Sequence, residues 1–156
     1  GVATGQYHAC ALLDNHSVKC WGGNQQGQLG LGDTVYRGDD ANEMGDALPG
    51  VNLGTGRTAY AIAAAGGRTC ALLDDHSVKC WGTNDYGGLG LGDTGDRGDG
   101  TNEMGDSLPV VNRGIGRSAH GSRVHGWFSG GTSRRGWGWE CAAWCTGRIL
   151  ARSEDS

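Results

Sequence analysis

The segment CALLDNHSVKCWGGNQQGQLGLGDT, residues 10–34, returns with few changes as CALLDDHSVKCWGTNDYGGLGLGDT at residues 70–94. The match extends beyond these two segments, because the motif NEMGD at residues 42–46 recurs at residues 102–106. Self-similarity at one fixed spacing is typical of proteins built from stacked repeats. The chain is therefore predicted to contain two copies of one structural unit.

The repeat divides the 156 residues into three parts. The first unit covers residues 1–60, the second covers residues 61–120, and residues 121–156 do not repeat the pattern. Short runs of small apolar residues, at 2–5 and 59–65, precede the repeated segment and suit a tightly packed strand. We expect each unit to be a set of short antiparallel strands.

A hairpin is predicted at the start of each repeated segment. In the first unit an apolar run, residues 10–13, and an alternating run, residues 17–21, flank the turn-forming residues Asp14, Asn15 and His16. The third position of such a turn usually has a left-handed backbone, which polar residues tolerate better than most. We expect this conformation at His16 and at its counterpart His76.

The hairpin register places Cys10 opposite Cys20, and Cys70 opposite Cys80, on one face of each hairpin. Facing residues of antiparallel strands are close enough for a disulfide. Two interpretations stay open: two stabilising bridges formed in an oxidising compartment, or small thiols buried between strands. Zinc fits less well, because a zinc knuckle has ligands two to four residues apart. No metal site is predicted.

Glycine is the most informative feature of the composition. The chain has 32 glycines, and those after each hairpin alternate with Leu29, Leu31, Leu89 and Leu91. Such glycines allow tight turns and close approach of another backbone. The spacing does not match a phosphate-binding loop, and no cofactor is predicted.

Net charge and hydropathy argue against two other classes, nucleic-acid-binding proteins and membrane-spanning proteins. The formal charge of −4 and the pI of about 5.6 argue against binding to nucleic acid. No apolar run is long enough for a membrane span. The start of the sequence lacks the pattern of a signal peptide, and because residue 1 already falls within a strand of the unit, we expect the chain to be a fragment of a longer protein.

The acidic spacers between the repeated segments contain the remaining site candidates. Their carboxylates could offer oxygen ligands to calcium, but they do not follow the EF-hand order. Solvated loops that contact a protein partner are the favoured interpretation. The candidate interaction residues are Arg37, Asp39, Asp40, Glu43, Asp46, Arg97, Asp99, Glu103 and Asp106.

Residues 121–156 change composition abruptly, becoming rich in Arg and Trp. A frame-shifted translation of a third repeat, a divergent cap and an interaction tail all fit this change, and we expect poor order. Cys141 and Cys145 form a weak metal signal, and Arg134-Arg135 near tryptophans only weakly suggests contact with single-stranded nucleic acid.

The pattern C-A-L-L-D-x-x-S-V-K-C-W-G, followed by G-x-N-x-x-G-Q-L-G and L-G-D, resembles the repeats of the regulator of chromosome condensation family, of the bacterial type. That resemblance implies an all-β fold: a partial β-propeller of two antiparallel blades, each with four strands, and an irregular C-terminal tail. Two features depart from the family pattern: His16 and His76 replace a turn glycine, and Arg68 replaces the histidine found at His8.

No catalytic constellation is apparent, so no enzyme is predicted. The favoured function is a non-catalytic protein-interaction module that presents loops to a protein partner. Alternatives are a regulatory propeller of the guanine-nucleotide-exchange or chromatin-associated type, and a calcium-dependent surface protein or enzyme inhibitor. Two blades alone cannot cover their own faces, so further blades should come from a longer chain or other copies. Bridged cysteines would favour a secreted or extracytoplasmic location.

Overall fold

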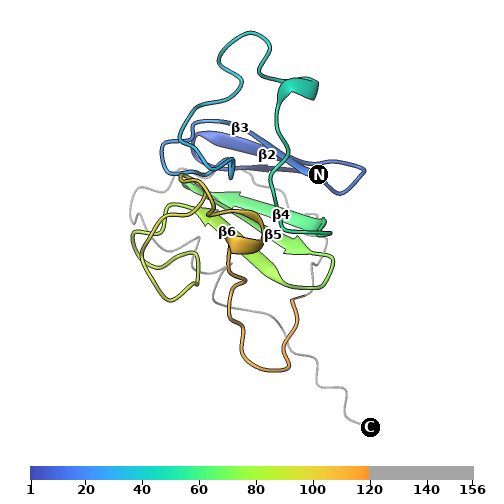
Figure 1. Ribbon diagram of the computed structural model, residues 1–156, viewed down its shortest axis with the longest axis vertical. Helices are drawn as coiled ribbons and strands as arrows, with labels where there is room; N and C mark the ends of the chain where they lie inside the picture. The colour runs from blue at the N-terminus through green and yellow to red at the C-terminus, as the bar shows by residue number, and fades with distance from the viewer. Residues whose placement is uncertain (120–156) are drawn as a thin grey trace, which may run out of the picture.

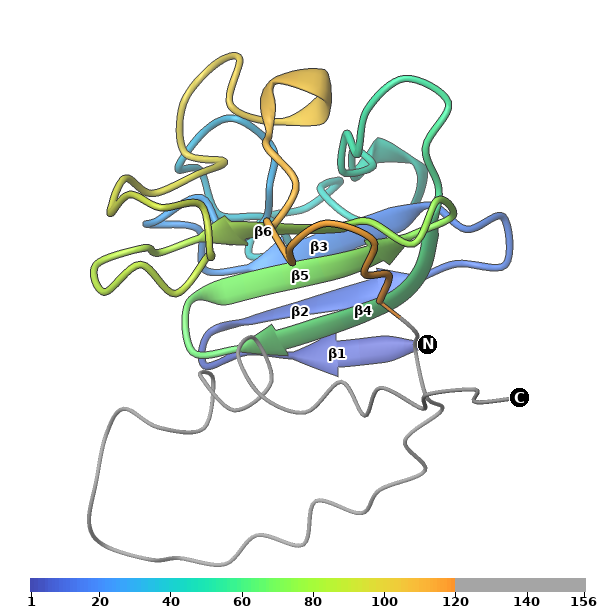
Figure 2. The same cartoon turned by 90° about the horizontal axis from the view of Figure 1, so that it is seen from below.

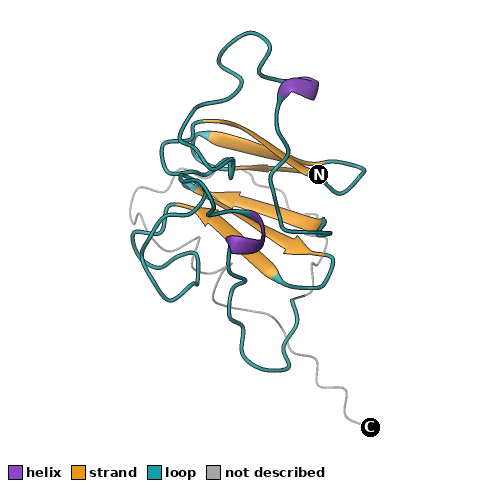
Figure 3. Cartoon of the chain, viewed as in Figure 1, coloured by secondary structure: helices purple, strands orange, loops and turns teal. Residues whose placement is uncertain are grey.

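The computed structural model describes residues 1–119 as two three-stranded antiparallel sheets, one per unit (Figure 1). Within these residues, loops make up more of the chain than strands do (Figure 3). The predictions made for residues 121–156 lie outside the described residues. The first sheet has the order β1 (Val2–Thr4), β2 (His8–Leu12), β3 (Val18–Gly22), and the second has the order β4 (Ala59–Ala65), β5 (Arg68–Leu73), β6 (Val78–Gly82).

Each hairpin has the register that the sequence predicts. In β2 and β3, Cys10 pairs with Cys20, and the corresponding pair in β5 and β6 is Cys70 with Cys80. His16 and His76, at the hairpin turns, both have φ of 63°, which is the left-handed conformation expected there.

Both cysteine pairs are disulfides in the structure. The sulfur atoms are 2.13 Å apart in each pair, and the Cα atoms are 4.1 Å apart. Of the two interpretations of the cysteines, the structure therefore has the bridges. Each bridge joins the two strands of one hairpin and therefore stabilises that hairpin, without linking the two sheets covalently.

The expected fourth strand is reduced to a single bridge in each unit. Arg37 pairs with Gly22, and Arg97 pairs with Gly82, outside the named strands. The next residue, Gly38 or Gly98, has φ of 92°, which turns the chain away from the extended conformation that a longer strand needs. The blades are therefore three strands wide plus one bridged residue.

The spacers that follow each sheet are irregular. Each contains one 3-10 turn, η1 (Gly45–Ala47) and η2 (Gly105–Ser107). Both turns lie on the side of the molecule away from β1 and β4 (Figure 2). The spacers therefore emerge at the outer edges of the two sheets, next to β3 and β6.

The two sheets pack face to face as two layers (Figures 1 and 2). We call the face that carries Trp21 or Trp81 the front of its blade, and the face that carries the disulfide the back. The back of blade one packs on the front of blade two. The buried core formed there contains Cys10, Val18, Cys20, Leu29, Val51, Leu53, Ala59, Ala71, Leu73, Trp81 and Leu108.

Among the described residues, no helix has the length and apolar character that crossing a membrane requires.

Candidate functional site

Asn24 organises the glycine-rich turn after the first hairpin. Its side chain is fully buried, and its amide nitrogen donates to the carbonyl oxygens of Asp33, at 2.8 Å, and Val35, at 3.1 Å. Its amide oxygen accepts the backbone N–H of Leu29 at 3.0 Å. A buried amide with its bonds satisfied holds a turn in one conformation. The repeated N in the W-G-x-N motif was a signal for this role that sequence reasoning did not use.

Asn84 does the same in the second unit. It donates to the carbonyl oxygen of Asp93 at 2.9 Å and accepts from the N–H of Leu89 at 3.0 Å. The two glycine-rich turns therefore share the hydrogen bonds of their asparagine side chains, whereas the bond from the Gln26 N–H to the Gln28 side chain has no counterpart at Gly88.

The glycine-rich turn of blade one, residues 24–32, packs against the front of blade two. The carbonyl oxygen of Gln28 accepts the hydroxyl of Thr69 at 2.9 Å and the indole N–H of Trp81 at 3.1 Å. Gly30 lies against the same indole, because a Cβ there would be 2.7 Å from Trp81 Nε1. Gly27 lies as close to the backbone of Asp99. These close approaches explain why glycine recurs in the turn.

His8 adds a buried polar contact between the blades. Its Nε2 lies 2.8 Å from Thr69 Oγ1, and its side chain is 5% exposed. Because the Thr69 hydroxyl donates its proton to Gln28, His8 Nε2 must be the donor, which fixes the neutral tautomer. His8 Nδ1 is buried and has no hydrogen-bond partner. Burial lowers the pKa of His8 to about 4.

Lys79 contributes a second buried contact at the front of blade two. Its ammonium donates to the carbonyl oxygens of Leu53, at 3.0 Å, and Gly105, at 2.7 Å. It thereby joins the two spacers. Burial lowers the pKa of Lys79, although nearby Asp106 and Asp75 act in the opposite direction.

The predicted interaction residues Arg37 and Arg97 make local ion pairs. Arg37 contacts Asp33 at 2.7 Å, and Arg97 contacts Asp93 at 2.6 Å. Each arginine also donates to the two backbone carbonyl groups that precede it. Their guanidinium groups therefore hold the spacer entrance in shape.

Glu43 and Glu103 support their own loops in the same way. Glu43 accepts the N–H groups of Gly38, at 2.8 Å, and Asp40, at 3.2 Å, and the N–H of Gly38 is the main cause of its lowered pKa. Glu103 accepts the corresponding N–H groups of Gly98 and Gly100. Burial raises the pKa of Glu103, but these bonds outweigh that effect and lower it overall.

Asp39, Asp40 and Asp99 differ in exposure. Asp39 and Asp40 are exposed, whereas Asp99 is half-buried. The pKa of Asp99 is raised, first because of burial and then because of its hydrogen bond with Glu103. The backbone of Gly27 lies directly on Asp99, so the seated turn of blade one causes this burial.

Asp106 joins the two spacers from outside the core. It accepts the backbone N–H of Thr55 at 2.8 Å and the hydroxyl of Thr55 at 2.5 Å. The Thr55 hydroxyl is the main cause of the lowered pKa of Asp106. Its counterpart Asp46 is exposed, and Ile115 occupies the position that corresponds to Thr55.

The structure thus distributes the predicted spacer residues along two loops and does not gather them into one cluster. Within residues 1–119, no group of three or more His, Cys, Asp or Glu side chains is arranged to hold a metal ion. Several of the carboxylates accept backbone or side-chain hydrogen bonds.

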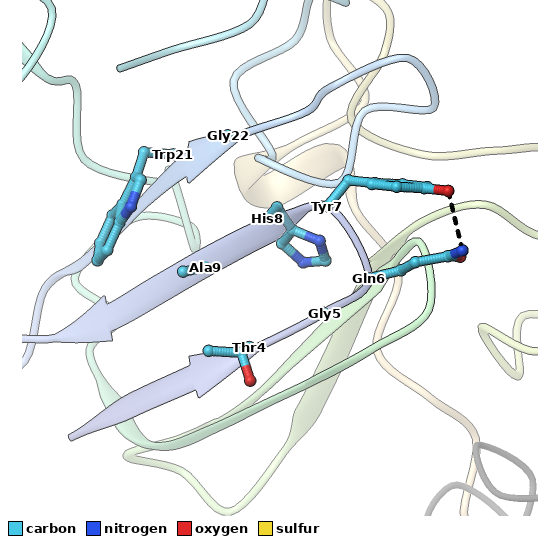
Figure 4. A pocket seen from close by; sticks show the side chains of 8 residues that line it. All are labelled: Thr4, Gly5, Gln6, Tyr7, His8, Ala9, Trp21 and Gly22. Atoms are coloured by element: carbon cyan, nitrogen blue, oxygen red, sulfur yellow. Dashed lines mark hydrogen bonds between the residues drawn. The ribbon is translucent and has the colours of Figure 1, made fainter. Parts of the chain in front are cut away.

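A cavity of about 420 Å³ opens between the β1–β2 turn and the end of β3 (Figure 4). Trp21 and Ala9 line it from the front of blade one, together with the turn residues Gly5, Gln6 and Tyr7. Tyr7 is 71% exposed, and its hydroxyl accepts a hydrogen bond from Gln6 at 3.1 Å. Sequence reasoning did not predict this cavity, because it depends on which face of the blade lacks a neighbour.

The stacked blades and the glycine turn seated between them define a repeat protein of the β-propeller class. Residues 1–28 and 61–87 match the profile of the regulator of chromosome condensation (RCC1) repeat. The chain therefore carries two RCC1 repeats, at these residues.

Curated relatives share this region. The ultraviolet-B receptor UVR8 of Arabidopsis thaliana is 37% identical over 98 residues, which cover 62% of this chain and 20% of UVR8. The human probable E3 ubiquitin-protein ligase HERC4 is 36% identical over 96 residues, covering 62% of this chain and 8% of HERC4. The matched region thus spans a fifth or less of these relatives' length.

Two solved structures are also similar. Yeast RCC1 (Prp20), in its crystal structure with Kap60, is 24% identical, with a TM-score of 0.44, covering 58% of this chain and 19% of that chain. Human WBSCR16 is 27% identical, with a TM-score of 0.43, covering 55% of this chain and 20% of that chain.

Proposed function

We propose that this chain is a non-catalytic protein-interaction module whose spacers contact a protein partner. The observation that carries the proposal is the repeated spacer structure. In both units a glutamate and an arginine hold the loop through backbone bonds, and the segments 41–42 and 101–102 stay exposed. A loop held in one conformation loses little entropy when it binds.

The exposed parts of the spacers have the chemistry of a polar binding surface. Asp46 and Asp106 are exposed at the two 3-10 turns, and the prolines at 49 and 109 that follow them are exposed as well. The overall charge of −4 favours a partner with a basic surface.

The relatives support an interaction role. A receptor and a probable ligase each match 62% of this chain, although their names describe different activities. A region common to proteins of different activity is better explained as a recognition scaffold than as a catalytic centre.

A charge-reversal variant tests the proposal. We expect Asp40→Lys/Asp46→Lys to lose a protein that the unchanged chain captures from an extract of its source cells, measured by quantitative mass spectrometry. The matched control is Asp14→Lys/Asp75→Lys, which changes the net charge equally at the two exposed hairpin turns, outside the spacers. The proposal fails if the control loses the same protein, or if the spacer variant retains all captured proteins.

A further inference from the structure

The two blades present the same face in different states. On the front of blade two, Thr69 and Trp81 are fully buried beneath the turn of blade one. On the front of blade one, the corresponding residues Ala9 and Trp21 are only half-buried and line the cavity described above. Among the described residues, no turn covers the front of blade one in the way that the turn of blade one covers the front of blade two.

The back of blade two is the reverse case. On the back of blade one, Cys10, Val18 and Cys20 are fully buried against blade two. The corresponding residues Cys70 and Val78 are half-buried, whereas Cys80 is 1% exposed. The described residues therefore have one open front and one open back, which are the two halves of the interface already formed inside the chain.

The open front also has an incomplete lysine site. Lys79 donates to two carbonyl oxygens, one from its own spacer and one from Leu53 of the preceding unit. Lys19 makes the first of these bonds, to Gly45 at 2.7 Å. For Lys19, the carbonyl group that corresponds to that of Leu53 would be the carbonyl of Arg113, from blade two of another copy of the chain.

The turn that would cover the front of blade one is already folded. Asn84 holds residues 84–92 with the same hydrogen bonds that Asn24 makes, and Gly87, Gly90 and Gly92 have positive φ like Gly27, Gly30 and Gly32. Gln28 bonds Thr69 and Trp81 through its backbone carbonyl and not through its side chain, so Gly88 at the equivalent position keeps this acceptor.

We propose that the front of blade one binds the back of blade two of a second copy of this chain. The turn at residues 84–92 of one copy would accept the indole N–H of Trp21 in the next. Such an interface is heterologous, so copies add head to tail and form a ring or a filament. Propellers typically have about 4–8 blades, so closed rings would contain two, three or four copies.

Two sequence differences between the repeats should make the interface between copies weaker than the interface inside the chain. Ala9 lacks the hydroxyl that Thr69 donates, and Ile115 lacks the hydroxyl that Thr55 donates to Asp106. Replacing each by its repeat counterpart should restore one hydrogen bond. This gives a test in which the expected change is a reversible gain that follows the protein concentration, which distinguishes it from the aggregation of a misfolded variant.

The experiment measures the mass of the complete chain by sedimentation velocity over a concentration series. We expect Ala9→Thr and Ile115→Thr each to tighten association by about threefold to tenfold, the value of one hydrogen bond. Ala9→Arg should weaken it by about a hundredfold or more, because the side chain would occupy the front of blade one. Ala9 is on the open front, so the thermal unfolding of Ala9→Arg should match that of the unchanged chain when both are recorded at a concentration low enough for single copies.

Ala41→Thr is the matched control. It also introduces the repeat counterpart, but position 41 and its equivalent Thr101 are both exposed, so association should not change. A single-copy mass at all concentrations would overturn the proposal. So would association that Ala9→Arg leaves intact. Neither result depends on whether the spacers bind a protein partner.

Discussion

Trp21 and Trp81 stand at the same position of two nearly identical units, yet only one of them belongs to the core. Trp81 is fully buried and donates its indole N–H to Gln28, whereas Trp21 is half-buried beside a cavity. Their neighbours within each unit are almost the same, so the unit itself does not decide the burial. The adjoining blade decides it.

The same rule explains other differences between the blades. Asp99 is half-buried where Asp39 is exposed, and Lys79 has two acceptors where Lys19 has one. Each pair has the same residue type at the same position of the repeat. In a stacked protein, stability is a sum of terms within units and terms between neighbours, and here the second kind of term can be measured by comparing equivalent residues.

The largest difference is expected between the two tryptophans. Trp81→Ala should lower the free energy of unfolding by about 3–5 kcal/mol, the usual cost of removing a fully buried aromatic side chain. Trp21→Ala should cost less, because Trp21 is only half-buried and its indole packs against no neighbouring turn among the described residues. Urea unfolding at one low protein concentration measures both. Equal losses would mean that the two environments do not differ as described.

A smaller effect is expected from His8, whose position in blade two is occupied by the permanently charged Arg68. The pKa of His8 is lowered from 6.5 to about 4 by burial. Between these pH values the unfolded chain takes up a proton at His8 and the folded chain does not. The stability contribution is therefore complete above pH 6.5 and is lost as the pH falls to 4, by at most about 3 kcal/mol.

The control for this pH dependence is His8→Gln, which keeps an N–H donor near Thr69 but does not titrate. We expect the difference in unfolding free energy between the two proteins to change over pH 6.5–4 in denaturant titrations. A difference that stays constant with pH would show that the His8 pKa is not lowered.

The smallest contrast concerns the order in which the disulfides are reduced. Both bridges join residues 10 apart in sequence, so each should contribute about 2.5 kcal/mol by the chain-entropy estimate. Their accessibility differs, because Cys10 and Cys20 are fully buried while Cys70 is half-buried. Under mild reduction with alkylation and mass spectrometry, Cys70–Cys80 should open first. Simultaneous opening would contradict the difference in burial.

The local structure of each unit follows from its sequence. The turn residues between the two runs predict the hairpin and the left-handed φ of His16, and the register predicts which cysteines face each other. These features depend on neighbours within about ten residues along the chain. The fourth strand is different: the four-stranded blade of the family was expected, but Gly38 and Gly98 turn the chain after one bridged residue.

The candidate site was less predictable, because it depends on contacts between units. The spacer carboxylates were read as groups free to bind a partner, whereas Glu43 and Glu103 accept N–H groups of their own loops. Thr69 was not singled out, although it bonds both His8 and Gln28. The sequence shows the repeat, but it does not show that Trp21 and Trp81 differ in burial. That difference arises only from the stacking of the two blades.

The direction in which the blades stack also bears on how such a gene can grow. Because every unit has one front and one back, a duplicated unit placed anywhere in the series meets a suitable face on each side. The stack lengthens while the number of uncovered faces stays at two. Tandem duplication therefore adds material without adding exposed apolar surface, until closure of the circle removes the last two faces.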